Sequence, residues 1–267
     1  MNAVTLEAAT GPGRRPLPSI PIRRVVAVEL RKMFDTRAGF WMLAGIGVTS
    51  MLAMAAVVLF APTDVQNYET YATSIGAPVA IILPMVALLA VTSEWSQRSG
   101  LTTFTLVPAR GRVIAAKAAA TLLVAVTAML LCIGVGVLGN MVGSAISGTD
   151  PSWETLSVST AVNGMLAGTV NMSMGFMLGV LIRNSAGAIV AYFVYTLLLP
   201  GVFGALAAFQ GWFRDLRPWV DLNLANTRLY DEQMTPQHWA QLGVTGLLWL
   251  VVPLAVGLFL LHRSEVK

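Results

Sequence analysis

Six long apolar stretches constrain this sequence more than any other feature. Each is about 20 residues long, which is the length that a helix needs to cross the roughly 30 Å hydrocarbon core of a bilayer. None contains Asp, Glu, Lys, Arg or His. They run over residues 40–61, 76–93, 118–138, 161–182, 186–209 and 242–261. Because only 11% of the residues are charged and 56% are hydrophobic, a soluble fold is excluded and an all-α membrane protein with six transmembrane helices is predicted.

The charged residues between these stretches predict the orientation of the chain, because Lys and Arg accumulate on the cytoplasmic side of a membrane protein. With the N-terminus inside, the cytoplasmic pieces hold fourteen of the seventeen Lys and Arg residues and five acidic residues, a net charge of +9. The outer pieces hold three basic and eight acidic residues, a net charge of −5. We therefore expect a multi-pass protein of the cell (inner or plasma) membrane with both termini in the cytoplasm. The bases lie between apolar runs rather than on one face, so nucleic acid is not an expected partner.

The segment before the first stretch divides into two parts. Residues 1–19 lack a continuous apolar region and are expected to form a disordered cytoplasmic tail rather than a signal peptide. Residues 20–36 predict a helix lying on the inner membrane surface, with Arg24, Arg31 and Lys32 on its polar face. Its apolar stripe is predicted to be Ile22, Val26, Leu30 and Met33. Glu29 falls at the shoulder of this stripe, where it either pairs with Lys32 on a solvated edge or makes a functional contact.

The segment between the second and third stretches is too polar for a span and too apolar for a free linker. Four residues would cover one side of a short helix that Pro108 ends: Leu101, Phe104, Leu106 and Val107. Such a helix needs a surface to pack on. That surface is one of three: the ends of this chain's own helices, the lipid surface, or a cytoplasmic partner protein.

These two segments carry a resemblance to a known family. A surface helix ending in Glu29-Leu30-Arg31-Lys32 is followed by a span, and later by Glu94…Gly100-Leu101…Leu106-Val107-Pro108-Ala109-Arg110…Lys117. This order resembles the permease subunits of ABC-2 type transporters. The resemblance implies a 20–267 transmembrane domain that pairs with a second permease copy or paralogue. It also implies two ABC ATPase subunits as partners, with ATP and Mg on the ATPases and no cofactor on this chain.

The resemblance further implies a cytoplasmic coupling helix between spans 2 and 3, which seats on the ATPase. The residues in or beside it would be Glu94, Arg98, Gly100, Leu101, Phe104, Pro108 and Arg110, with Lys117 next to them. In the interfacial helix, the corresponding residues are Glu29, Arg31 and Lys32.

Small residues and a proline predict how the spans pack. One face of the fourth span is lined by small residues, which would let another backbone approach closely. These residues are Gly164, Gly168, Asn171, Gly175 and Gly179. Packing within the chain is the favoured interpretation, with a subunit interface or a substrate wall as alternatives. Pro200 lies within the fifth span, where it removes a backbone donor and predicts a kink, either structural or a pivot.

The outer segment 210–241 contains aromatic residues that would anchor short interfacial or re-entrant helices, such as members of the family carry. These are Trp212, Phe213 and Trp219. An ordinary exposed loop is the alternative. Thr235-Pro236 predicts an N-cap followed by proline at the first helical position, so the sixth helix would start before its apolar stretch.

Several kinds of chemistry have no residues here to support them. There is no Gly-rich phosphate loop followed by Lys. The two histidines, His238 and His262, fall in opposite compartments, so neither a catalytic nor a metal site is expected. Since the apolar stretches contain no titratable acid or base for coupling to protons, the energy for uphill transport would come from outside the chain. We therefore expect a transport subunit that is not itself an enzyme, exporting lipid-like or amphipathic molecules. A secondary carrier or channel and a non-transporting membrane scaffold are the alternatives.

Overall fold

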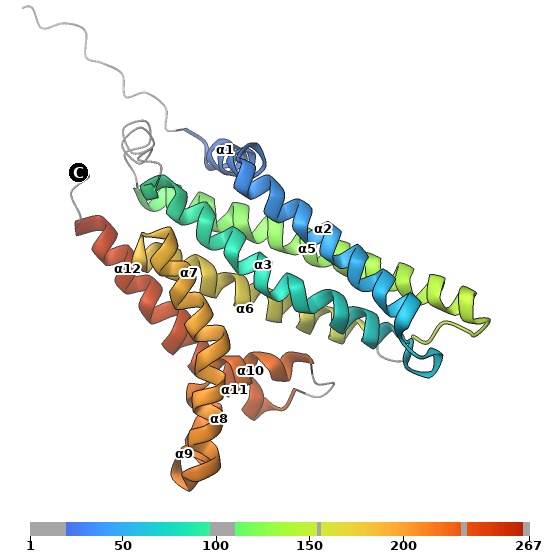
Figure 1. Ribbon diagram of the computed structural model, residues 1–267. Helices are drawn as coiled ribbons and strands as arrows, with labels where there is room; N and C mark the ends of the chain where they lie inside the picture. The colour runs from blue at the N-terminus through green and yellow to red at the C-terminus, as the bar shows by residue number, and fades with distance from the viewer. Residues whose placement is uncertain (1–19, 97–109, 154–155, 231–233, 264–267) are drawn as a thin grey trace, which may run out of the picture.

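The computed structural model describes residues 20–96, 110–153, 156–230 and 234–263 (Figure 1). The protein is all-helical, with 91% helix and no strand among the described residues. Six helices are long and apolar enough to cross a membrane, which confirms the number predicted from the sequence. The first four are α2 (Arg37–Phe60), α3 (Tyr68–Ser96), α5 (Arg110–Ser147) and α6 (Val158–Ile182). The fifth comprises α7 (Ser185–Phe193), a π-helical turn (Val194–Leu198) and α8 (Leu199–Phe209). The sixth comprises α11 (Pro236–Gly246), a second π-helical turn (Leu247–Val251) and α12 (Val252–Arg263).

The second and third helices extend well beyond the apolar stretches that identified them. α5 has 38 residues, or roughly 57 Å at about 1.5 Å per residue. Glu94 lies on α3 and Lys117 lies on α5, so both helices carry charged residues just beyond the ends of their uncharged apolar stretches. An apolar run gives only the minimum length of the helix that contains it, because Ala, Glu, Lys and Arg also favour helix. No helix-breaking residue lies near Lys117, so the helix continues past it.

α3 lies at the centre of the bundle, where it packs against α2, α5, α6 and α7 (Figure 1). Of its most apolar 18 residues, 56% are buried, whereas the corresponding figure for the fifth span is 11%. An apolar helix that is buried on most sides belongs to the core. The fifth span instead leaves its apolar surface facing outward, toward lipid or another chain.

The helix α1 (Ile22–Asp35) forms within the predicted interfacial segment and packs against α5 and α2. Its buried residues are Val25, Glu29 and Met33, whereas Ile22 is 45% exposed. Met33 of the predicted stripe is therefore buried as expected and Val26 and Leu30 are half-buried, but the prediction is wrong for Ile22, and Glu29 lies in the middle of the buried face. α12 ends at the same end of the bundle as α1, which we call the α1 end (Figure 1).

The fifth and sixth spans share an uncommon local structure, a π-helical turn that precedes a proline. The N–H of Leu199 donates to the carbonyl of Val194, five residues earlier, and Pro200 follows without an N–H. The residue five positions after Tyr195 is Pro200, so the Tyr195 carbonyl has no π-helical N–H donor. Asn223 supplies one from outside the helix, with 3.2 Å between its Nδ2 and the Tyr195 oxygen. Pro200 thus follows a widened turn in a helix that continues on both sides.

Short helices fill the segment between the fifth and sixth spans. They are α9 (Gly211–Val220) and α10 (Leu222–Thr227), followed by one 3-10 turn, η3 (Arg228–Tyr230). Phe213 is buried while Trp212 is 63% exposed, so the two neighbouring aromatic residues face opposite ways. Trp249 on the sixth span donates from Nε1 to the carbonyl of Val220, 2.7 Å away. The predicted cap of the sixth helix is present, with Thr235 Oγ1 accepting from the N–H of His238 at 3.2 Å.

Candidate functional site

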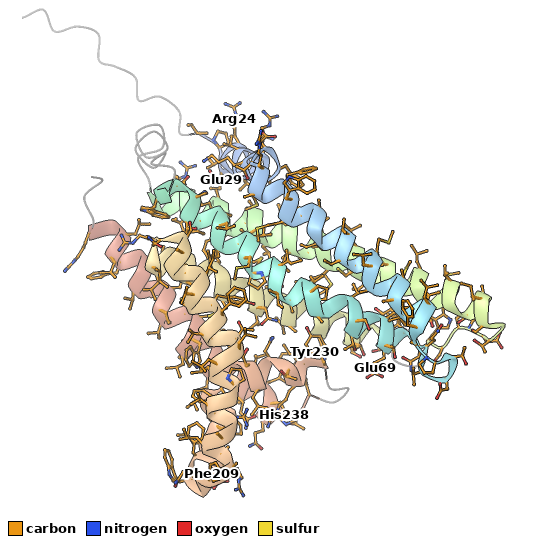
Figure 2. The ribbon with its side chains drawn as sticks, in the orientation of Figure 1. Arg24, Glu29, Glu69, Phe209, Tyr230 and His238 are labelled. Atoms are coloured by element: carbon orange, nitrogen blue, oxygen red, sulfur yellow. The ribbon has the colours of Figure 1, made fainter. Side chains whose placement is uncertain are left out.

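Four charged side chains from three helices meet at the α1 end of the bundle. Glu29 and Lys32 come from α1, Glu94 from α3 and Lys117 from α5. Lys117 Nζ pairs with Glu29 Oε2 and lies 3.3 Å from Glu94 Oε1. Lys32 Nζ lies 2.8 Å from Glu29 Oε1 and 3.3 Å from Glu94 Oε1. We call these four residues the charge cluster; Figure 2 shows the position of Glu29.

The charge cluster is largely removed from solvent. Lys117 is 1% exposed, and Glu29 and Glu94 are each 3% exposed. Burying single charges is very costly, but two acids and two bases in contact balance one another. Lys117 also donates to the carbonyl of Ala90 at 3.0 Å, so its ammonium has partners on both α1 and α3. The cluster therefore joins three helices that are far apart in the sequence.

Lys32 lies at the edge of the cluster, where its side chain is 42% exposed. Burial lowers the pKa of the Lys32 ammonium, but hydrogen bonding and Coulomb attraction to Glu29 and Glu94 together outweigh burial. Its pKa is consequently raised above the ordinary value. Lys32 stays charged at neutral pH.

Glu94 retains unused hydrogen-bonding capacity. Its Oε1 lies 3.3 Å from the Nζ atoms of both Lys32 and Lys117. Its Oε2 is buried without a hydrogen-bond partner among the described residues. Glu94 lies two residues before the end of α3. Among the described residues, no donor therefore reaches this second carboxylate oxygen, which lies next to the predicted coupling segment.

The structure describes only part of the predicted coupling element. Five of its predicted residues lie outside the described residues: Arg98, Gly100, Leu101, Phe104 and Pro108. Arg110 is the first residue of α5, and its side chain is likewise outside the description. Of the three residues predicted in the interfacial helix, Glu29 and Lys32 meet Glu94, whereas Arg31 is exposed elsewhere on α1.

Lys117 was expected beside the coupling element, but its pairing with Glu29 was not predicted. Two signals were available. Glu29 interrupts an otherwise apolar face, and Lys117 is flanked by five alanines at 115, 116, 118, 119 and 120. Small neighbours let another helix approach a lysine closely enough to bury it.

The predicted strip of small residues on α6 divides into two parts. A Cβ on Gly175 would lie 2.1 Å from the carbonyl oxygen of Pro84, and one on Gly179 would lie 3.0 Å from Val91 Cβ. This part of α6 packs directly against α3. Gly164, Gly168 and Asn171 instead line a pocket, and Asn171 Oδ1 accepts from Asn226 Nδ2 at 3.2 Å.

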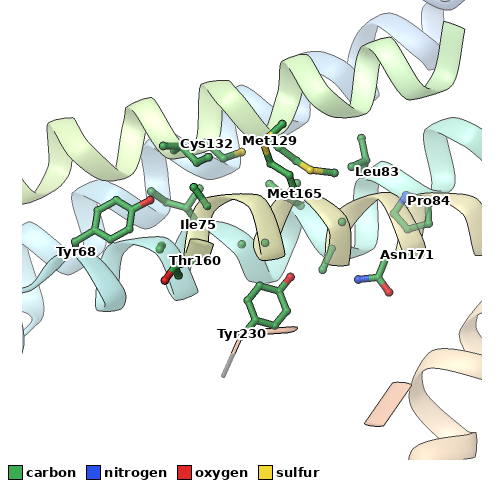
Figure 3. A pocket seen from close by; sticks show the side chains of 18 residues that line it. Tyr68, Ile75, Leu83, Pro84, Met129, Cys132, Thr160, Met165, Asn171 and Tyr230 are labelled. Carbon is green, nitrogen blue, oxygen red and sulfur yellow. The ribbon is translucent and has the colours of Figure 1, made fainter. Parts of the chain in front are cut away.

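The pocket has a volume of about 160 Å³ and lies between α3, α5 and α6, with Tyr230 of η3 across it (Figure 3). Pro200 does not line it.

Among the described residues no three His, Cys, Asp or Glu side chains form a possible metal site. No protein-family model matches the chain, and no curated protein matches it either.

Proposed function

We propose that this chain is the permease subunit of an ATP-driven ABC transporter of the ABC-2 type. The observation that carries the proposal is the charge cluster, which joins α1 to the two helices that flank the predicted coupling segment. A force applied between residue 96 and residue 110 would act on α3 and α5 together. Through Glu29 and Lys32 it would also act on α1.

In this proposal the α1 end faces the cytoplasm, and two separate ATPase subunits bind there. ATP with Mg closes the ATPase pair, and the segment around residues 100–107 passes that motion to the permease. Two permease chains then move between inward-facing and outward-facing states. Nucleotide drives this change only because it stabilises one of the two states more than the other.

The central position of α3 supports such a transmission. α3 ends at the charge cluster, where it contributes Glu94, and it packs against four other helices. Because well-packed interfaces do not deform continuously, displacing one end of α3 shifts its neighbours as units. The substrate class that we propose, lipid-like or amphipathic molecules for export, agrees with the uncharged lining of the pocket.

Two experiments test the proposal. Purification in a mild detergent followed by mass spectrometry of co-eluting proteins should find an ABC ATPase.

In the purified complex, Leu101→Asp or Gly100→Pro should abolish substrate-stimulated ATP hydrolysis while the permease still inserts and pairs. Leu131→Ala, on a 64% exposed position of α5, is the control and should leave stimulation intact. Absence of any ATPase, or unchanged stimulation in both loop variants, contradicts the proposal.

A secondary carrier is the second candidate, and the charge cluster is the observation that favours it. Ion-coupled carriers use buried acids and bases, but they place them near the middle of the membrane. Here Glu94 lies two residues from the end of α3 and Lys117 seven from the start of α5. Transport driven by an ion gradient in liposomes that contain this chain and no ATPase would favour the carrier.

A further inference from the structure

The pocket between α3, α5 and α6 lies in the part of the bundle away from the α1 end. It is lined by the first half of α3, the middle of α5 and the first half of α6, and η3 approaches from the side (Figure 3). Its volume of about 160 Å³ resembles that of an engineered protein cavity of roughly 150 Å³ that binds benzene. It therefore has room for one aromatic ring or a short piece of hydrocarbon chain.

Two of the three glycines in the lining leave space around them, whereas the third, Gly168, would place a Cβ 2.3 Å from Met129 Cε. A Cβ on Gly76 would meet no atom within 4 Å, and one on Gly164 would only touch Tyr230 Cε1 at 3.9 Å. Both glycines line the pocket. On the same helix as Gly164, Gly175 is in direct contact with the backbone of α3. The bundle is thus closely packed next to the pocket, so the hollow is local.

The described residues of the lining are mostly apolar. Much of the wall is formed by Ile75, Leu83, Met129 and Met165, and no Asp, Glu, Lys, Arg or His occurs among the described residues that line it. The two methionines are adaptable and polarisable, which suits ligands of varied shape. A charged group would enter without a counter-ion, and that is costly in a low-dielectric interior.

Tyr68 gives the pocket one polar feature that has no use within the described protein. Its side chain is buried, with 6% exposure, and its hydroxyl points toward the interior of the pocket (Figure 3). No hydrogen bond joins this hydroxyl to any described residue. A hydroxyl that faces the pocket and has no partner among the described residues can donate to a ligand oxygen that lies there.

We infer that this pocket binds an uncharged, mainly hydrocarbon molecule that carries one hydrogen-bonding oxygen. The apolar part fills the hollow beside Gly76 and Gly164, and the oxygen pairs with the Tyr68 hydroxyl. A membrane lipid chain and a diffusible amphiphile share this chemistry. The inference concerns binding and stands apart from the transport proposal, because it needs no ATPase to be tested.

Photolabelling of the full chain in liposomes tests this inference. One probe is a long-chain alcohol with a diazirine in its chain, and the second is a diacylglycerol, an uncharged lipid, with the diazirine in an acyl chain. The third has the alcohol's chain with a trimethylammonium head. We expect the first or second probe to label peptides covering residues 68–84 and 160–171, and the third to label them at least about tenfold less. Which of the two uncharged-chain probes labels more strongly identifies the source of the occupant.

Variants then separate binding from general contact with lipid. Gly164→Leu fills the hollow and should reduce pocket labelling at least about tenfold. Gly134→Leu, at an exposed glycine of α5 with no atom near its Cβ, is the control and should label as the original chain does. Tyr68→Phe should reduce labelling by the alcohol about threefold to tenfold, the effect of one neutral hydrogen bond. Equal labelling in Gly164→Leu and Gly134→Leu, or labelling by the trimethylammonium probe that equals the alcohol's, overturns the inference.

Discussion

The two parts of the bundle fill their interiors in opposite ways. At the α1 end, charged side chains from three helices occupy the interior and balance one another. Further along α3 and α5, a hollow that α6 also lines has no charged residue among its described lining residues. Each arrangement is sensitive to a different kind of change. The charge cluster is vulnerable to losing a partner, whereas the pocket is vulnerable to gaining a side chain.

The largest effect should come from removing the most buried base. Lys117→Met leaves Glu29 and Glu94 close together with only half-exposed Lys32 to neutralise them. Breaking a buried ion pair by removing one partner costs about 3–5 kcal/mol. We expect a large drop in the thermal unfolding midpoint of the purified chain in detergent.

Two further variants show whether that drop reflects unbalanced charge. Arg31→Met removes an exposed base from α1 and should change the midpoint little. Lys117→Met combined with Glu29→Gln removes one charge of each sign and should recover part of the loss. If Lys117→Met and Arg31→Met unfold at the same temperature, the buried cluster does not stabilise the fold.

An intermediate effect is expected on α6, where packed and hollow parts adjoin. Gly175→Ala would place a methyl group 2.1 Å from the Pro84 carbonyl oxygen, so the backbones of α3 and α6 would have to separate. Overpacking of this kind costs about 1–3 kcal/mol. Gly164→Ala adds the same atoms at a distance of 3.9 Å from the nearest one and should be nearly neutral. Thermal unfolding of both variants measures the difference, and equal destabilisation would mean that the hollow is not open in the folded protein.

The sequence predicted the global architecture because each span carries its own signal. An apolar run long enough to cross a bilayer can be recognised without knowing its neighbours, as can the Thr235-Pro236 cap. The charge cluster depends on residues 29, 94 and 117 meeting in space, and no local pattern encodes that meeting. Glu29 shows the difficulty: helical periodicity placed it at the edge of the apolar stripe, whereas its partner on α5 holds it in the buried face.

The pocket was only half predictable for the same reason. The spacing of the small residues on α6 was visible, but their separation into a packed part and a hollow part depends on what α3 and α5 present to them. The Pro84 carbonyl meets Gly175, whereas the nearest atom to a Cβ on Gly164 would be Tyr230 Cε1 at 3.9 Å. Tyr68 offered no sequence signal, because a tyrosine at the start of a helix is ordinary until its surroundings are known.

The smallest effect should come from the exposed edge of the charge cluster, and it tests how far burial governs the larger one. Lys32→Met removes a base that contacts both acids, as Lys117 does, but solvent screens a side chain that is 42% exposed. We expect a loss of about 1 kcal/mol or less, measured by thermal unfolding beside Lys117→Met. Because the pKa of Lys32 is raised in the fold, its contribution is fully present below its unfolded pKa of about 10.4 and disappears only as pH rises through the folded value. The difference between the original chain and Lys32→Met should therefore stay constant from about pH 6 to about pH 9. A difference that vanishes within that range would show that Lys32 loses its charge there and does not hold the two carboxylates.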